Sequence, residues 1–164
     1  MTLLLSRSTG LLMVTLTLVP VTVTPAQPPS DTCGRLEFGD WRQWTSVTEE
    51  PIVSPGHSYH WVGVFVDKLA KTTYLSASAP YPQCARIVKP IYGDEEGVDV
   101  LRLTAMVKMP PGYDPEHGDW WYGVYDAAGT ESRRAGRLED CIRCHREAAD
   151  TDYLFSRDVT LTLD

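Results

Sequence analysis

The segment CIRCH, at residues 141–145, constrains what this chain can fold into more than any other feature. Two cysteines three positions apart are followed directly by a histidine. On a helix, Cys141 and Cys144 lie about one turn apart on the same face. Two thioether bonds to a haem need this spacing, and His145 follows where an imidazole can lie under the iron. The pattern therefore predicts one covalent haem c, with His145 as the iron ligand.

Two other kinds of site also use paired cysteines. A structural zinc site needs four ligands, and the remaining histidines, His57, His60 and His117, have no paired spacing. A thioredoxin-like dithiol is expected early in a βαβ unit, whereas this pair lies near the end of a chain without a parallel-sheet pattern. Haem attachment is therefore favoured over both.

The function of a haem iron depends on whether its sixth coordination position is occupied by a protein ligand. A second strong ligand favours electron transfer, whereas an open position allows gas binding or catalysis. Beyond the N-terminal segment the methionines are Met106, in a strand-like run, and Met109, at the start of a proline-rich loop. Methionines in such places more often pack than bind metal, so a six-coordinate electron carrier is the least favoured of the three functions.

The N-terminal segment has the layout of a secretory signal peptide. Residues 1–26 contain one charge, Arg7, then a short apolar run and the small residue Ala26 as a cleavage point. A membrane anchor is the alternative, but Pro20 interrupts the run, which is shorter than the roughly 20 apolar residues that a span needs. We therefore expect a periplasmic or otherwise exported protein with no membrane segment after cleavage. A flexible leader at 27–37 and a single domain at 38–164 would follow.

The net charge limits the classes of partner that the protein can bind, and the cysteine content bears on the compartment in which it folds. The formal net charge of −7 becomes −8 when residues 1–26 are removed, because only Arg7 is lost. Nucleic-acid binding is disfavoured, since it needs clustered lysine and arginine. Small neutral molecules or a basic redox protein suit this surface better. Outside the CIRCH motif, Cys33 and Cys84 could form a disulfide after export or remain two separate buried thiols.

The middle of the chain alternates strand-like runs with turns. Four runs rich in aromatic and β-branched residues cover 58–67, 84–92, 98–107 and 119–127. Helices are expected from Asp40, over 68–77, and over the C-terminal stretch that carries CIRCH. Short strands with tight connections favour antiparallel pairing. The prediction is an α+β domain, with an antiparallel sheet, flanking helices and a C-terminal haem-bearing helix.

The motif and its surroundings resemble the cytochrome P-460 family, which includes the β-sheet form of cytochrome c-prime. The stretch CIRCHREAADTDYLFS is similar to the C-terminal signature of that family. Upstream, HWVGVFVDKLAKTTYLSASAPYPQCARIVKPIY and LTAMVKMPPGYDPEHGDWWYGVYD are similar to its strand, short helix and following strands. The resemblance runs from about Phe38 to Phe155, and its C-terminal motif is the most specific part.

The resemblance implies a roughly five-stranded antiparallel sheet, a homodimer and a five-coordinate haem held by Cys141, Cys144 and His145. The enzymes of the family oxidise hydroxylamine and carry a lysine bonded to the porphyrin edge. That lysine matches Lys89 in RIVK, with Lys108 as a second candidate. The neighbours depart from the family pattern, with Gln83-Cys84 before the strand and Pro90 after the lysine. The alternative for Lys89 is a strand-end lysine with its amine in water.

The residues opposite the iron ligand decide between catalysis and binding. His60 is the polar candidate for a proton shuttle, and the alternative is a half-exposed strand histidine. Arg143 and Arg146 flank the ligand and could pair with a haem propionate, although exposed helix arginines are more usual.

We therefore expect a hydroxylamine-oxidising protein with Lys89 and His60 as catalytic residues. Its partners would be a small nitrogen-containing substrate and a soluble cytochrome that accepts electrons. Binding of nitric oxide or carbon monoxide is the alternative.

Overall fold

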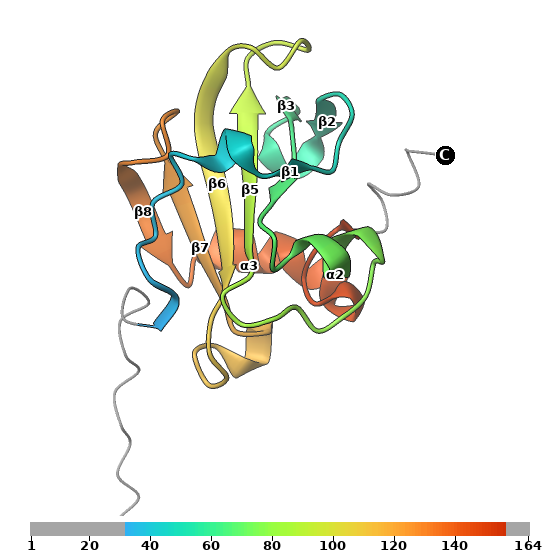
Figure 1. Ribbon diagram of the computed structural model, residues 1–164, viewed down its shortest axis with the longest axis vertical. Helices are drawn as coiled ribbons and strands as arrows, with labels where there is room; N and C mark the ends of the chain where they lie inside the picture. Colours follow the sequence, from blue (N-terminus) through green and yellow to red (C-terminus); the bar gives the residue numbers. More distant parts are fainter. Residues whose placement is uncertain (1–31, 157–164) are drawn as a thin grey trace, which may run out of the picture.

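The structure is a computed structural model that describes residues 32–156 (Figure 1). The expected signal peptide at 1–26 lies outside the described residues. No helix within 32–156 is long and apolar enough to cross a membrane.

The fold is a mixed α+β domain dominated by one eight-stranded sheet whose pairings are all antiparallel. The strand order is β1-β4-β5-β6-β7-β8, and β3 joins β2 to β5 beside this path. The strands are β1 (Thr45–Ser46), β2 (Ile52–Ser54), β3 (His60–Val62), β4 (Phe65–Val66), β5 (Arg86–Tyr92), β6 (Val100–Lys108), β7 (Trp120–Tyr125) and β8 (Ser132–Gly136).

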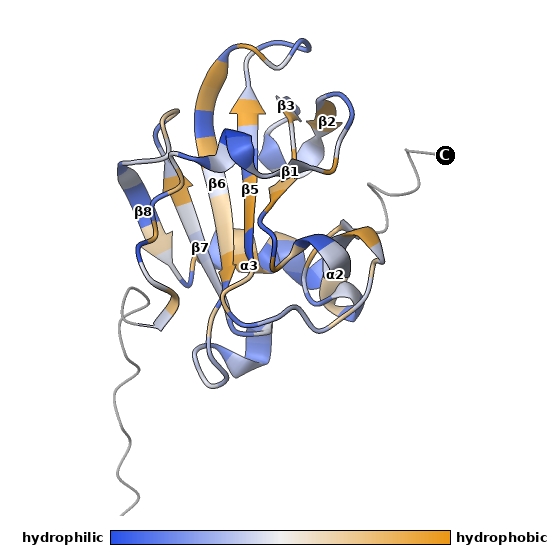
Figure 2. Cartoon of the chain, in the orientation of Figure 1, coloured by the Kyte–Doolittle hydropathy of each residue, from blue (hydrophilic) through white to orange (hydrophobic). Residues whose placement is uncertain are grey.

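The expected antiparallel α+β class is confirmed, but the expectation of about five strands is wrong. Three of the four strand-like runs correspond to β5, β6 and β7, while Gly63 and Val64 divide the first run into β3 and β4. The additional strands escaped prediction because β1 and β2 are two or three residues long. In β8 the four residues of Ser132–Ala135 are exposed, so the strand has no alternation of buried and exposed positions. Figure 2 shows the hydrophilic start of β8 beside the more apolar central strands.

The two faces of the sheet carry separate clusters of buried residues. Side chains alternate along each strand, so Ile87 and Val88 point to opposite faces. Ile87 pairs with Met106, which pairs in turn with Tyr122, and these three belong to one cluster. Val88 belongs to the other cluster, together with aromatic residues of the N-terminal segment such as Phe38. The first face is covered by the C-terminal helix (Figure 1).

The helices are short. Helix α3 (Glu139–His145) carries CIRCH and continues as a 3-10 segment, η4 (Arg146–Thr151), as the C-terminal sequence predicts. Its first turn holds Glu139 and Asp140, whose negative charges favour a helix N-terminus. Helix α2 (Lys71–Leu75) occupies part of the range expected at 68–77. The helix expected from Asp40 is a single 3-10 turn, η1 (Trp41–Gln43), and Asp40 makes no side-chain cap.

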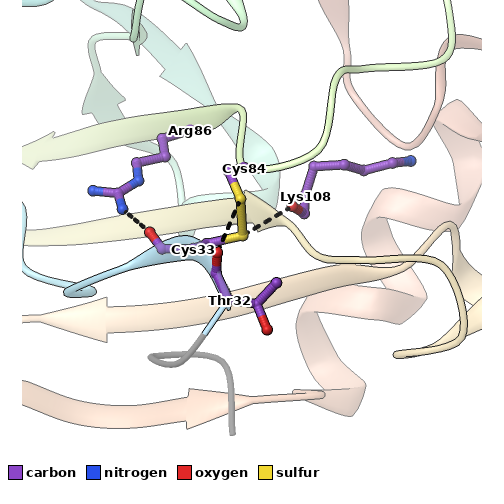
Figure 3. Close-up of a disulfide and its surroundings, with 5 residues drawn as sticks. All are labelled: Thr32, Cys33, Cys84, Arg86 and Lys108. Atoms are coloured by element: carbon purple, nitrogen blue, oxygen red, sulfur yellow. Dashed lines mark hydrogen bonds between the residues drawn. A yellow bond between two sulfur atoms is a disulfide. The ribbon is translucent and has the colours of Figure 1, made fainter. Parts of the chain in front are cut away.

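A disulfide between Cys33 and Cys84 joins the N-terminal segment to the start of β5 (Figure 3). The structure thus decides between the two states considered for these cysteines. The hydroxyl of Tyr125 donates to the carbonyl of Leu36 at 2.5 Å, which holds the same segment. Residues 32–37, expected at the end of a leader, are therefore attached to the domain. A disulfide is typical of proteins that fold outside the reducing cytosol.

Candidate haem-binding site

A cavity of about 680 Å³ lies between α3 and the sheet face that carries Ile87. Its volume is within the range of about 300–1,000 Å³ that is usual for small-molecule and cofactor sites. Strands β5, β6 and β7 form one wall, and α3 and the 3-10 turn η2 (Pro55–His57) form others. Much of the lining is apolar, including Ile52, Val62, Val64, Ile87, Met106 and Phe155.

The three motif residues of α3 all line this cavity. Cys141 and Cys144 are free thiols that are partly buried, and His145 is buried. Burial raises the pKa of the Cys141 thiol, so the group is held as a neutral thiol. The helix thus presents two sulfurs and one imidazole to the same mostly apolar cavity.

The ring of His145 is held by a backbone carbonyl. Its Nδ1 lies 2.7 Å from the carbonyl oxygen of Tyr153. A carbonyl only accepts, so Nδ1 carries the hydrogen and Nε2 keeps the lone pair that a metal needs. Burial, reinforced by the charge of Lys89, lowers the pKa of His145 to about 3. The ring centroid lies 5.6 Å from that of Tyr122 and 5.5 Å from that of Phe155.

The wall beside Cys144 is shaped by a glycine. A Cβ placed on Gly56 would lie only 3.1 Å from the Cys144 sulfur, so this turn approaches α3 as closely as it does because Gly56 has no side chain. Two thiols, one neutral imidazole and an apolar cavity are the donor set and surroundings that a covalent haem needs. The residues present fit a haem c, which Cys141, Cys144 and His145 would hold.

Of the two lysines considered for the porphyrin edge, Lys89 lines the cavity. It lies on β5 opposite Thr104, and its Nζ is 5.9 Å from the ring centroid of Phe155. Burial lowers its pKa, which increases the fraction of neutral, nucleophilic amine. Lys108 is not among the lining residues, and its Nζ is 2.6 Å from the Asp152 carboxylate.

Besides His145, the histidine that lines the cavity is His57, in η2, and not the expected His60. His60 is half-buried on β3, and its Nδ1 is 3.0 Å from the carbonyl oxygen of His57. Burial, followed by the charge of Lys89, lowers the pKa of His57 to about 3, so this ring is neutral at pH 7. Sequence reasoning missed His57 because it lies in a turn, where no periodic pattern shows which way a side chain points.

The arginines that line the cavity are not the ones that the sequence suggested. Arg143 and Arg146 are exposed on the helix and do not line the cavity, whereas Arg102 and Arg134 do. Arg134 is paired with Asp140, and none of the ion pairs found within residues 32–156 involves Arg102. Either arginine could pair with a propionate, and no sequence spacing indicated them.

The methionines considered as sixth ligands lie on different faces. Met106 lines the cavity, and Met109 belongs to the cluster on the opposite face of the sheet. Met109 is therefore a packing residue. The aromatic residues Trp120, Trp121 and Tyr125 are buried as well, and none of them lines the cavity.

Comparison with known proteins supports this description of the site. The profile of the family Cytochrome P460 matches residues 39–156, which include most of the described fold and the whole CIRCH motif. No curated protein matches the chain. The family implies a covalent haem, and the paired thiols of α3 are consistent with its attachment. This chain belongs to the cytochrome P460 family.

Proposed function

We propose that this protein is an exported mono-haem cytochrome that oxidises hydroxylamine or a related small nitrogen species. The observation that carries the proposal is the meeting of Cys141, Cys144, His145 and Lys89 at one cavity. The first three provide covalent attachment and one iron ligand. Lys89 is the residue that resembles the cross-linked lysine of the family's hydroxylamine-oxidising members.

A haem bound here would supply a redox-active iron with an open coordination position. The chain itself would orient His145 through Tyr153, exclude bulk water with the apolar lining, and accept protons. The neutral ring of His57 is a hydrogen-bond donor and acceptor at the cavity wall. His60 would act on this ring indirectly, because its hydrogen bond to the His57 carbonyl holds the turn.

Hydroxylamine oxidation releases protons and electrons, so the protein needs an acceptor for each. When two hydroxylamine molecules become one nitrous oxide and one water, four protons and four electrons are released. We infer that the protons leave through polar residues of the wall such as His57, and that the electrons pass to a soluble cytochrome. The acidic surface suits a basic partner of this kind.

Lys89 is proposed to bond the porphyrin edge during maturation. Its amine would lose one N–H hydrogen and the ring carbon one C–H hydrogen as the C–N bond forms. One peroxide molecule would accept these two hydrogens and become two waters. The lowered pKa of Lys89 supports this role, because only the neutral amine can attack.

The setting of this chemistry is proposed to be the periplasm or a comparable exported location. The layout of residues 1–26 and the Cys33–Cys84 disulfide both support export. A homodimer is proposed from the family resemblance.

The test combines a spectrum, a mass and a turnover assay on the mature protein. Hydroxylamine oxidation with an artificial electron acceptor, a red-shifted Soret band in the reduced state and a haem peptide that includes Lys89 are expected. Lys89→Met should abolish the red shift, whereas Lys71→Met, an exposed lysine on α2, should preserve it. A protein without covalent haem would defeat the proposal.

Binding of nitric oxide or carbon monoxide without turnover is the second candidate, favoured by the largely apolar lining, which suits small neutral gases. An ordinary five-coordinate ferrous spectrum without hydroxylamine turnover would replace the enzyme proposal with this one. A low-spin spectrum that is lost in Met106→Ala would instead indicate electron transfer, because Met106 lines the cavity.

A further inference from the structure

A buried ion pair lies outside the cavity, one residue along the chain from the carbonyl that contacts His145. The Nζ of Lys108 is 2.6 Å from both carboxylate oxygens of Asp152, and the two side chains are only 12% and 9% exposed. Lys108 ends β6, and Asp152 follows η4, 44 positions later in the chain. A pair this deeply enclosed is costly to desolvate and would be disrupted by removal of either partner.

Lys108 is anchored at its backbone. Its N–H donates to the carbonyl of Ala85 at 3.0 Å, and its carbonyl accepts from the N–H of Cys84 at 2.7 Å. The Cys33–Cys84 disulfide fixes that end of β5 (Figure 3). Figure 3 also shows the Lys108 side chain extending away from the disulfide. The ammonium group therefore approaches Asp152 from a rigid part of the sheet.

Asp152 is held from three directions. Besides the ion pair, its Oδ2 accepts the N–H of Tyr81 at 2.8 Å, and its carbonyl accepts the indole N–H of Trp120 at 2.8 Å. These contacts hold the backbone in an unusual conformation. Asp152 and Tyr153 are consecutive residues, and both have a positive φ, of 54° and 68°. Residues other than glycine adopt this left-handed region only when their surroundings hold them there.

The left-handed pair determines where the carbonyl of Tyr153 points. This oxygen accepts the Nδ1–H of His145 at 2.7 Å. The Tyr153 N–H donates to the carbonyl of Ala148 at 2.8 Å, and its hydroxyl donates to the carbonyl of Glu116 at 3.0 Å. The ion pair is thus one residue away from the group that orients the iron ligand.

We propose that Lys108 and Asp152 are positioning residues that set the hydrogen bond between His145 and the Tyr153 carbonyl, and through it the donor strength of His145 toward iron. A hydrogen bond at Nδ1 fixes the tautomer and raises the basicity of a metal-bound imidazole. A stronger donor stabilises ferric iron and strengthens the bond between iron and histidine. This inference rests on covalent haem at Cys141 and Cys144, which the proposed function shares, but not on hydroxylamine as substrate.

The test compares four variants of the haem-loaded protein. Lys108→Met removes the ion pair, and Lys108→Arg should restore most of it. Asp152→Asn keeps the size, tolerates the left-handed φ and still offers an oxygen to Tyr81, but loses the charge. Lys68→Met is the matched control at an exposed lysine.

The readouts are the iron–histidine stretching frequency of the ferrous protein and the midpoint potential, neither of which requires turnover. Lys108→Met and Asp152→Asn should lower the frequency and raise the potential, while Lys108→Arg and Lys68→Met remain close to wild type. Unchanged values in folded Lys108→Met and Asp152→Asn would overturn the inference. If Lys108→Met does not fold, Asp152→Asn decides alone.

Failure of Asp152→Asn to fold would equally overturn the inference, because the pair would then support the whole fold and not the ligand. Covalent haem without hydroxylamine turnover would defeat the proposed enzyme activity and leave this inference standing. Absence of covalent haem from the wild-type protein would defeat both.

Discussion

Gly56 lies directly against Cys144, so that a Cβ on the glycine would be 3.1 Å from the sulfur. The contact joins η2, which begins just after β2, to α3 near the end of the chain. It occurs at one of the two atoms proposed to bond the haem. Space beside this sulfur is therefore controlled by a residue 88 positions away in the chain.

The first prediction concerns this contact. Gly56→Ala should impair the thioether bond at Cys144, because η2 or α3 must shift, at a cost of about 1–3 kcal/mol if the contact behaves as ordinary overpacking. Mass spectrometry of haem peptides, with alkylation of any free Cys144, should detect protein attached through Cys141 alone.

Gly39→Ala is the matched control. A Cβ there would meet Thr130 at 3.5 Å, an ordinary contact, and the site lies away from the cavity. Gly39→Ala should keep both thioether bonds. Complete thioether formation at Cys144 in Gly56→Ala would contradict the prediction, because it would show that η2 can shift without impairing haem attachment.

The second prediction separates the two histidines. His57→Leu should lower hydroxylamine turnover per haem by about 100-fold, the lower end of what acid–base groups contribute. His60→Leu should have an effect below about tenfold, since its ring supports the His57 backbone and does not line the cavity. Steady-state rates normalised to haem content test both. A larger loss in His60→Leu would restore His60 as the direct participant.

The part of the site that could be predicted from the sequence has a local or periodic signature. The CIRCH motif can be recognised from residue spacing alone. The match of RIVK to the family pattern identifies Lys89 as a candidate site residue. Strand alternation then places Lys89 on the same face as Ile87, toward the cavity. The long strands β5, β6 and β7 were predictable for the same reason, because their buried residues recur along a continuous run.

The rest depends on contacts between distant segments. His57 reaches the cavity because β2 and β3 pair and carry η2 against α3, which no local pattern encodes. Lys108 in AMVK resembles Lys89 in RIVK, since each lysine directly follows a valine, yet the partner of Lys108 is Asp152. The direction taken by such a side chain is decided by what packs beside it in three dimensions.

The third prediction concerns Arg102, which lines the cavity without an ion pair of its own among residues 32–156. If Arg102 faces a haem propionate, its positive charge favours the ferrous state. Arg102→Gln should then lower the midpoint potential, by an amount on the order of tens of millivolts for one partly screened charge. This direction is opposite to that expected for Lys108→Met.

Arg133→Gln, at an exposed position on β8, is the control for the same change of charge. It should leave the potential within a few millivolts of wild type, because solvent screens an exposed charge. Equal shifts in the two variants would mean that overall charge, and not a propionate contact, causes the effect.

The last prediction concerns the Cys33–Cys84 disulfide, which closes a loop with a sequence separation of 51. Replacing both cysteines by serine should lower the free energy of unfolding by about 4 kcal/mol, because a link across a loop of this size restricts the unfolded chain. Urea unfolding of the haem-loaded protein measures the loss. Wild-type protein with this disulfide reduced should match the double variant, since both lack the link. If reduced wild type is much more stable than the variant, the serines disturb local packing, and the entropic explanation is wrong.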